Sequence, residues 1–215
     1  MGADHPSVDP PARGGRLARH PDPSAGRRPP ARPARPDGAR VRPLAVLVGL
    51  PGAGKSTVGR LMAEHLGVGF RDTDEDIESG AGRSVAQLFA QGGEHRFREL
   101  EKAAVRTALA EHAGVLALGG GAVVDPDTRG LLAGGPVVHV DAEVREVLGR
   151  RGGVAGRPLL AGDATARLWE LAAQRAPFYR EVARVTVPTR GRDAAQVARV
   201  ALSLILRSAA PLRGR

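Results

Sequence analysis

The strongest constraint on the fold of this chain is the run Gly-Leu-Pro-Gly-Ala-Gly-Lys-Ser-Thr at residues 49–57. It follows an apolar run at residues 44–48, typical of a buried strand, and leads into residues 55–66, which have helical periodicity and stop at Gly67. A glycine-rich loop between a strand and a helix turns backbone N–H groups inward, and the helix start adds its positive dipole end. The sequence therefore predicts a phosphate-binding loop of the G-x-x-x-x-G-K-[ST] type, and with it an α/β fold.

Each position of this loop has an expected role in binding a nucleoside triphosphate. The residues expected to contact the phosphates are Gly52, Ala53, Gly54, Lys55, Ser56 and Thr57. Lys55 can reach the β- and γ-phosphates, and the Ser56 hydroxyl can ligate Mg²⁺. A dinucleotide-binding loop is the alternative, because Asp72 and Asp74 lie about 20 residues further on, where a ribose-binding acid is expected. That alternative fails, since Thr57 stands where a third glycine is needed and Lys55 would have no role.

The rest of the chain alternates short apolar runs with amphipathic stretches. Strands are predicted at residues 68–72, 115–118, 137–140 and 185–187, and helices at residues 74–79, 94–111, 142–151, 164–175 and 194–206. Ser84 with Gln87 resembles a capping box and predicts one more helix start. Strands that alternate with helices imply a parallel sheet covered on both faces. The predicted fold class is an α/β three-layer sandwich with a five-stranded parallel sheet.

The positive charge of the chain is concentrated near its N-terminus. The formal net charge is +9, and residues 1–43 hold nine arginines, no lysine, four aspartates and ten of the 17 prolines. Such a segment cannot bury enough apolar surface to offset the cost of ordering, so residues 1–43 are predicted to be a disordered extension. A basic arm that binds nucleic acid is the functional alternative to an inert extension.

Composition excludes several other classes of protein. The chain has no cysteine, which rules out disulfides, thiolate metal sites and a cysteine nucleophile and is compatible with the cytoplasm. The six histidines show no metal-ligand spacing. No apolar stretch approaches the roughly 18 residues of a membrane-spanning helix, so none is expected.

Two acids and a glycine run follow the second and third predicted strands. Asp72 and Asp74 lie at the carboxyl edge of the sheet, where ligands bind in open α/β folds. One could hold a metal-bound water and the other could accept a hydroxyl proton, whereas helix capping is the alternative. The third strand runs into Gly119, Gly120 and Gly121, which could present N–H groups to an anion or form a tight turn. No acid follows that strand, unlike in nucleoside triphosphatases whose metal is held by such an aspartate.

Three arginines are candidates for binding anions, each with a simpler alternative. Arg98 could pair instead with Glu94 or Glu101 at helical spacing. Arg157 lies in a glycine-rich stretch suited to a lid that closes over phosphates. Arg175 precedes Ala-Pro-Phe-Tyr at a predicted helix end, where it could interact with the C-terminal dipole. Composition and periodicity do not choose between these alternatives.

Taken together, these motifs make the chain resemble the shikimate kinase family, which is a small P-loop family of the nucleoside-monophosphate-kinase-like fold. The resemblance runs from about residue 44 to residue 206. It is carried by the loop at residues 49–57, Asp-Thr-Asp, Phe97-Arg98 followed by Glu101, Gly-Gly-Gly-Ala, Arg-Pro-Leu-Leu-Ala-Gly and Arg-x-Pro-x-Tyr. It implies ATP-dependent phosphorylation of the 3-hydroxyl of shikimate, on the route to chorismate and the aromatic amino acids. It also implies a substrate-binding subdomain after the second strand and a mobile lid.

The resemblance assigns roles on the substrate side. Asp74 would hold the shikimate hydroxyls and act as a base. Asp72 would support the Mg²⁺ that Ser56 binds. The residues that would bind the shikimate carboxylate are Arg98, Gly120, Gly121 and Arg175.

The resemblance also assigns roles on the ATP side. Arg157 would reach the γ-phosphate from the lid, and Arg150 and Arg192 would flank the adenine. The implied catalytic residues are Lys55, Asp74 and Arg157. The implied organisation is an extension at residues 1–43, a kinase domain at residues 44–207 with a lid at about 150–163, and a tail at residues 208–215.

Two other interpretations stay open. A gluconate kinase of the same fold is the nearest, although two arginines converging on a carboxylate and the glycine run favour shikimate. A non-catalytic nucleotide-binding module with a nucleic-acid-binding arm is the other. Aromatic residues make up only 3% of the chain, however, and a single-strand-binding platform needs them. The expected protein is a cytoplasmic, monomeric enzyme without nucleic-acid or membrane partners.

Overall fold

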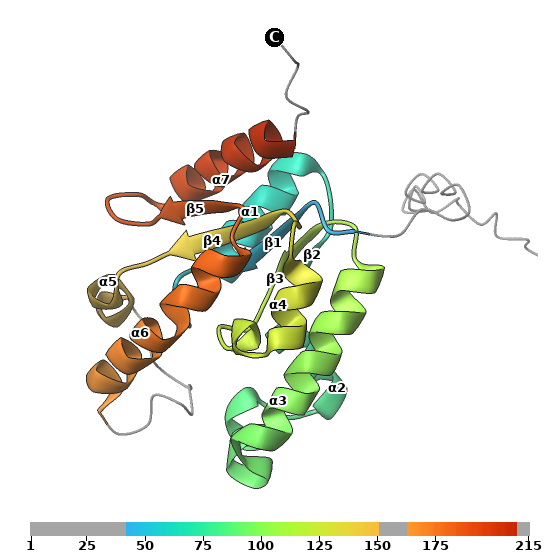
Figure 1. Ribbon diagram of the computed structural model, residues 1–215, viewed down its shortest axis with the longest axis vertical. Coiled ribbons are helices and arrows are strands. Elements are labelled where there is room, and N and C mark those ends of the chain that lie inside the picture. The colour runs from blue at the N-terminus through green and yellow to red at the C-terminus, as the bar shows by residue number, and fades with distance from the viewer. Residues whose placement is uncertain (1–41, 151–162, 210–215) are drawn as a thin grey trace, which may run out of the picture. The chain divides into compact units, whose positions relative to one another are not determined.

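The computed structural model describes residues 42–150 and 163–209, which form a five-stranded sheet with helices on both faces (Figure 1). All strand pairs are parallel, in the order β2-β3-β1-β4-β5. The strands are β1 (Ala45–Val48), β2 (Phe70–Asp72), β3 (Val115–Ala117), β4 (Val137–Asp141) and β5 (Val185–Pro188). Because β1 lies between β3 and β4, the loops that leave β1 and β3 are neighbours at the carboxyl edge of the sheet.

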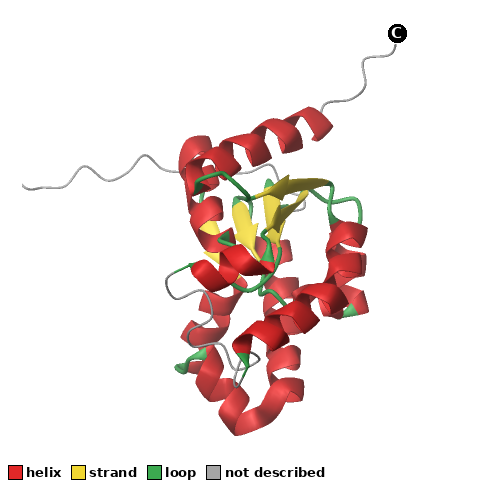
Figure 2. Ribbon diagram, turned by 90° about the vertical axis from the view of Figure 1, so that its left-hand side faces the viewer, coloured by secondary structure: helices red, strands yellow, loops and turns green. Residues whose placement is uncertain are grey.

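Helices cover both faces of this sheet, as Figure 2 shows. The helices on one face are α1 (Lys55–Leu66) and α7 (Ala194–Ala209), and those on the other are α3 (Val85–Glu111), α4 (Pro126–Leu132) and α6 (Ala164–Val182). The remaining helical segments of the described part are α2 (Thr73–Ala81), α5 (Val144–Gly149) and the 3₁₀ turn η1 (Ala122–Val124). This arrangement confirms the predicted three-layer α/β sandwich.

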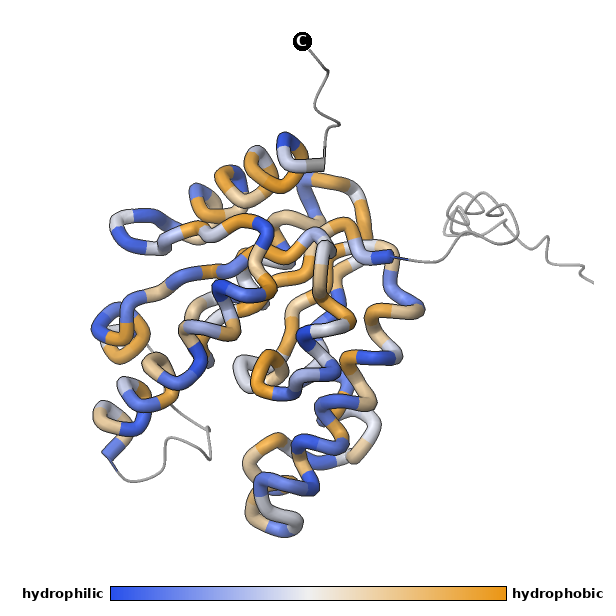
Figure 3. The backbone as a smooth tube through the Cα atoms, in the orientation of Figure 1, coloured by the Kyte–Doolittle hydropathy of each residue, from blue (hydrophilic) through white to orange (hydrophobic). Residues whose placement is uncertain are grey.

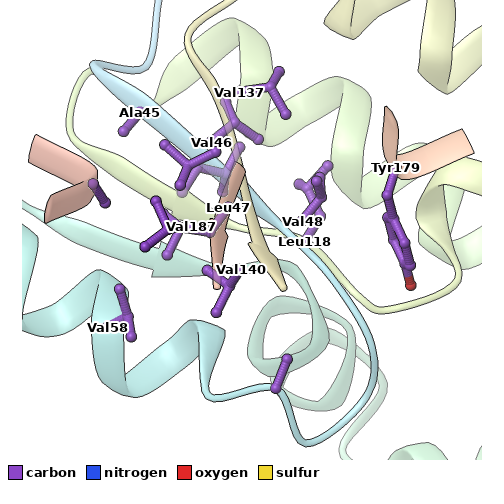
Figure 4. Close-up of a cluster of buried hydrophobic side chains, with 14 of the residues drawn as sticks. Ala45, Val46, Leu47, Val48, Val58, Leu118, Val137, Val140, Tyr179 and Val187 are labelled. Atoms are coloured by element: carbon purple, nitrogen blue, oxygen red, sulfur yellow. The ribbon is translucent and has the colours of Figure 1, made fainter. Parts of the chain in front are cut away.

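The core lies on the central strands and between them and the helices. All four residues of β1 are buried, because this strand has a neighbour on each side and helices above and below. Figure 4 shows Val46 and Val137 within one buried cluster and Tyr179 at its edge. In Figure 3, α7 alternates apolar and polar residues, since only one side of the helix meets the sheet.

Several helix ends form as the sequence predicts. α1 ends at Gly67, whose φ of 64° is the left-handed conformation that favours glycine. α3 begins with the predicted capping box, in which the Ser84 hydroxyl accepts from the Gln87 N–H at 3.3 Å and the Gln87 side-chain oxygen accepts from the Ser84 N–H at 2.9 Å. The two helices predicted here join into one segment that leaves helical geometry at Gly93.

α6 is longer than predicted. The prediction ended this helix at residue 175, but α6 continues through Pro177 to Val182. Arg175 therefore lies inside the helix and is buried. The alternative in which Arg175 interacts with a helix C-terminal dipole is wrong.

α4 is a helix that the prediction missed. Its start has two recognisable signals, because the Asp125 carboxylate accepts from the Thr128 N–H at 2.8 Å and Pro126 occupies the first turn. The other predicted boundaries shift by at most three residues.

The predicted extension at residues 1–43, lid at 150–163 and tail at 208–215 fall almost entirely outside the described residues. Their boundaries stay predictions. Among the helices of the described part, none combines the length and the apolar character needed to cross a membrane.

Candidate active site

A cleft of about 790 Å³ opens along the carboxyl edge of the sheet. Its walls come from the loop after β1, from α2 and α3, from the turn at residues 119–121 and from α6. Ligands bind at this edge in parallel α/β folds. The predicted site residues that line the cleft are Gly52, Ala53, Gly54, Lys55, Ser56, Thr57, Asp72, Asp74, Arg98, Gly120, Gly121, Arg150, Arg175 and Arg192. The remaining predicted residue, Arg157, lies outside the described residues.

One half of the cleft is the loop at residues 49–57, which we call the phosphate loop. Gly49 packs so closely on β4 that a Cβ atom there would collide with the carbonyl oxygen of Val140. Lys55 is buried, and its Nζ donates to the carbonyl oxygens of Gly49 at 3.0 Å and Leu50 at 3.1 Å. The loop therefore holds an ammonium group beside the backbone N–H groups that bind phosphates in such loops.

Ser56 and Asp72 connect the phosphate loop to the end of β2. The Ser56 hydroxyl donates to one Asp72 carboxylate oxygen at 2.7 Å, and the other oxygen accepts from the Asp74 N–H at 3.0 Å. Asp72 thus caps α2, as one of its two interpretations predicts, and it still presents an oxygen toward the loop. A hydroxyl and a carboxylate suit Mg²⁺, which usually takes few protein ligands and completes its shell with water and phosphate oxygens. Within residues 42–150 and 163–209, no group of three histidine or acidic side chains is placed to hold a metal ion.

Two further arginines line the cleft, and one of them contacts the phosphate loop. Arg150 donates to the Gly52 carbonyl oxygen at 2.9 Å and to the Thr189 hydroxyl at 3.3 Å. Arg192 donates to the Pro188 carbonyl oxygen at 3.0 Å. Both residues line the cleft, and their contact with adenine stays a prediction.

Asp74 follows Asp72 in the first turn of α2 and is half-buried. Burial raises the pKa of Asp74 to about 6, the charge of Asp72 adds to the rise, and Lys55 opposes it. A carboxylate with a pKa near neutrality can both accept a proton and return it. Asp74 is therefore suited to act as a base in the cleft.

Arg98 forms the ion pairs that its helical spacing predicts. Its guanidinium contacts Glu94 at 2.8 Å and Glu101 at 2.6 Å. The Glu94 side chain is exposed, whereas the Glu101 side chain is 4% exposed. Arg98 also lines the cleft, so the ion pairs hold the guanidinium at the site and do not remove it from there.

Glu101 was predicted only as one of two ion-pair partners of Arg98, but its carboxylate also lies in the cleft. Burial raises the pKa of Glu101, while the positive charges of Arg98, Arg175 and Lys55 oppose that rise. The carboxylate lies where these three cations meet and partly neutralises them. Its spacing of three residues from Arg98 predicted the ion pair but not the burial of the carboxylate among these cations.

The turn at residues 119–121, which we call the glycine turn, leaves no room for side chains. A Cβ atom on Gly119 would lie 2.5 Å from a carboxylate oxygen of Glu101 and 2.6 Å from one of Asp74. A Cβ atom on Gly121 would collide with the guanidinium of Arg98. The turn is made of glycine because both acids and the arginine pack directly against its backbone.

The middle glycine of this turn joins the two halves of the cleft. A Cβ atom on Gly120 would lie 2.7 Å from Cδ of Pro51 in the phosphate loop. The Gly120 carbonyl oxygen accepts hydrogen bonds from Arg175 Nη1 at 3.1 Å and from the Tyr179 hydroxyl at 2.6 Å. α6 therefore brings a second guanidinium to the same turn that Arg98 contacts.

We call Asp74, Arg98, the glycine turn and Arg175 the acceptor half of the cleft. An apolar surface adjoins it, formed by the rings of Phe89 and Phe97, whose centroids are 4.6 Å apart. Guanidinium groups match the geometry of a carboxylate, and a carboxylate side chain matches a hydroxyl group. The acceptor half fits a small molecule that carries a carboxylate, hydroxyl groups and an apolar face.

The parallel sheet, the phosphate loop and the Asp74 carboxylate beside it together define a P-loop kinase of a small metabolite. Comparison with known proteins narrows this class, because the family model described as shikimate kinase matches residues 51–206. The chain belongs to the shikimate kinase family. A shikimate kinase from Streptomyces coelicolor is 54% identical over 163 residues, which are 76% of this chain and 95% of that protein.

Solved structures agree with this family. A shikimate kinase from Acinetobacter baumannii in complex with shikimate has a TM-score of 0.75 and 37% identity, covering 80% of this chain and 96% of that chain. A gluconokinase from Sinorhizobium meliloti has a TM-score of 0.51 at 20% identity, covering 79% and 94% of the two chains, and shares the fold alone. The predicted family and its kinase activity are confirmed, and they are supported over the gluconate kinase and the non-catalytic module.

Proposed function

We propose that this protein transfers the γ-phosphoryl group of ATP to the 3-hydroxyl group of shikimate, using the residues that line the cleft. The observation that carries this proposal is their convergence: a phosphate loop, a carboxylate with a pKa of about 6 and two arginines at one glycine turn share a single cleft. These groups match the chemistry of the donor, the reacting hydroxyl and the acceptor carboxylate in turn.

The phosphate loop would bind ATP through the backbone N–H groups of residues 52–57 and the ammonium group of Lys55. Ser56 and Asp72 are the residues that would hold Mg²⁺, which when bound neutralises phosphate charge and orients the γ-phosphoryl group. Phosphoryl transfer has a loose transition state, so positioning and positive charge contribute more than covalent help. Lys55 supplies a charge that is already desolvated.

The acceptor half would bind shikimate through its carboxylate. Arg98 and Arg175 would each offer a guanidinium fork, and Gly120 and Gly121 would contribute backbone contacts. Glu101 holds Arg98 at 2.6 Å, so this guanidinium is in place before the substrate arrives. Such preorganisation lowers the entropic cost of binding.

Asp74 would bind the reacting hydroxyl and accept its proton. The hydroxyl oxygen attacks the γ-phosphorus, a new O–P bond forms, and the bond between the γ-phosphorus and the bridging oxygen breaks to release ADP. The proton stays on the Asp74 carboxylate until it passes to solvent. A pKa of about 6 leaves Asp74 mostly ionised at neutral pH, as this step requires.

Three further assignments and the cellular setting complete the proposal. Arg157 would reach the γ-phosphate from a lid, and Arg150 and Arg192 would flank the adenine. The protein would act in the cytoplasm as a monomer, without a nucleic-acid partner.

A coupled ADP-release assay tests this function. Purified protein with ATP and Mg²⁺ should release ADP when shikimate is added and should not do so with gluconate or without an acceptor. Phosphorus NMR of the product should place the phosphate on the 3-oxygen. ADP release with gluconate alone would overturn the acceptor-half assignments while keeping the phosphate loop.

A further inference from the structure

Tyr179 is the only tyrosine of the chain, and its hydroxyl contacts the glycine turn of the acceptor half. The residue lies one helical turn after Arg175 on α6 and is 2% exposed. The hydroxyl donates to the Gly120 carbonyl oxygen at 2.6 Å, the same oxygen that accepts from Arg175 at 3.1 Å. Tyr179 itself does not line the cleft. Two donors from α6 thus hold one carbonyl group of the glycine turn.

These hydrogen bonds set the orientation of the next peptide N–H. The Gly120 carbonyl points toward α6, and no peptide bond of the described chain is cis. In a trans peptide the N–H points opposite to the carbonyl oxygen, so the Gly121 N–H points away from α6. Gly121 lines the cleft, and within the described residues its N–H has no hydrogen-bond partner. This orientation leaves a donor available to an anion.

The glycine turn needs hydrogen bonds from other elements to fix its backbone conformation. The peptide between Gly120 and Gly121 has no side chain on either side, so its backbone has more accessible conformations than that of residues with side chains. A rotated peptide would direct the carbonyl oxygen at a bound carboxylate, and two partial or full negative charges would repel each other. The hydrogen bonds from α6 oppose that rotation.

Tyr179 is itself held in place. Its ring stacks on His139 of β4, with centroids 5.0 Å apart and planes 19° apart, at the edge of the core cluster in Figure 4. Burial raises the pKa of Tyr179 to about 12, although the charge of Arg175 and a hydrogen bond with it oppose the rise. The phenol therefore stays protonated, and remains a donor, throughout the neutral range.

We propose that Tyr179 is a positioning residue that locks the glycine turn so that the Gly121 N–H and Arg175 face the shikimate carboxylate. It acts through Gly120 and touches neither substrate. The inference rests on the proposed function, because it places the acceptor carboxylate at the glycine turn.

Tyr179→Phe tests this role, since it removes one oxygen and keeps the ring on His139. Loss of this hydrogen bond should weaken shikimate binding by about five- to tenfold. Kd and KM for shikimate should therefore rise by this factor. KM for ATP and kcat should stay within about twofold of wild type. Shikimate binding is measured by calorimetry without nucleotide, and both KM values by steady-state kinetics.

A matched control and a substrate analogue separate positioning from general damage. Phe178→Leu changes the neighbouring side chain of α6, which packs 4.4 Å from the Arg129 guanidinium and does not line the cleft, and should leave KM for shikimate unchanged. Methyl shikimate lacks the carboxylate charge, so Tyr179→Phe should lower kcat/KM for this ester much less than for shikimate. An equal loss with both acceptors would overturn the positioning role.

The outcomes also separate this inference from the proposed function. Wild-type protein that does not phosphorylate shikimate would overturn both. Wild-type protein that does so, beside a Tyr179→Phe variant with wild-type Kd, would overturn the positioning role alone. Circular dichroism checks the fold of the variant. If it does not fold, His139→Ala keeps the phenol but removes its support, and must raise KM for shikimate selectively for the inference to stand.

Discussion

The phosphate loop and the acceptor half of the cleft are built in opposite ways. The phosphate loop is one stretch of nine residues and presents mainly backbone donors and one lysine. The acceptor half collects its groups from α2, α3, the glycine turn and α6, and presents mainly charged side chains. Burial raises the pKa of Asp74 and of Glu101, the acid that pairs with Arg98, and nearby cations oppose the rise in both. The first half depends on local sequence, and the second depends on how distant elements pack.

The largest expected effect comes from the phosphate loop. Lys55→Ala removes the buried ammonium group, and kcat/KM for both substrates should fall by roughly a thousandfold. Steady-state kinetics measure this loss. Lys102, the only other lysine, pairs with Asp127 at 2.6 Å near the surface, and Lys102→Ala is the matched control. Ordinary activity in Lys55→Ala would contradict the assignment of the phosphate loop.

A smaller and more selective loss should follow a change of the base in the acceptor half. Asp74→Asn cannot accept the hydroxyl proton, so kcat should fall by about a hundredfold or more while ATP binding is kept. Turnover and nucleotide affinity are measured side by side. Asp76→Asn, on the same helix, removes only an ion pair with Arg71 and should stay near wild type. Equal losses of turnover and ATP binding would indicate a structural role for Asp74.

The same substitution should stabilise the folded protein. Folding raises the pKa of Asp74 from 3.8 to about 6, so the folded state binds this proton more tightly and ionised Asp74 opposes folding. Above pH 6, Asp74→Asn should raise the free energy of unfolding by about 3 kcal/mol, and the gain should vanish below about pH 4. Urea unfolding at pH 8 and pH 4 measures it. If Asp74→Asn is less stable than wild type at pH 8, ionised Asp74 does not destabilise the folded state.

The raised pKa also predicts how activity depends on pH. Protonated Asp74 cannot act as a base, so kcat/KM for shikimate should fall about tenfold per pH unit below about pH 6. A pH profile of wild-type protein measures this limb. The residual activity of Asp74→Asn should not show this fall below pH 6. If both proteins show the same fall, protonation of Asp74 is not its cause.

The smallest effect is expected from a change of geometry at constant charge. Arg98→Lys keeps a cation but loses the fork that matches a carboxylate, and should raise KM for shikimate about fivefold with KM for ATP unchanged. Arg106→Lys, on the surface of the same helix, is the control. Unchanged shikimate affinity in Arg98→Lys would contradict the carboxylate-binding role of Arg98. Its only role would then be its ion pairs with Glu94 and Glu101.

This contrast between the halves also explains what the sequence could predict. All five strands and the sandwich followed from periodicity, and the phosphate loop followed from one contiguous motif. The prediction ended α6 at residue 175, but Pro177 costs the helix only one N–H donor and the helix continues to Val182. α4 was missed although Asp125 and Pro126 carried its start signals.

The acceptor half was predictable only in part. Motif resemblance pointed to Asp74, Arg98 and Arg175, but no spacing in the sequence gives the burial of Glu101 among three cations. The bond from Tyr179 to the glycine turn likewise depends on where α6 lies relative to β3. Such contacts arise from packing between elements, and a single sequence does not encode them locally.

The close packing of Gly120 on Pro51 has a consequence for inhibitor design. A compound that joins a phosphate mimic to a carboxylate-bearing ring would span this contact and would need only a short linker. A substitution at Gly120 that displaced this compound would place its Cβ atom 2.7 Å from Cδ of Pro51, closer than non-bonded carbon atoms approach. A resistance substitution at Gly120 would therefore distort the phosphate loop and the glycine turn, and so impair the enzyme as well as inhibitor binding.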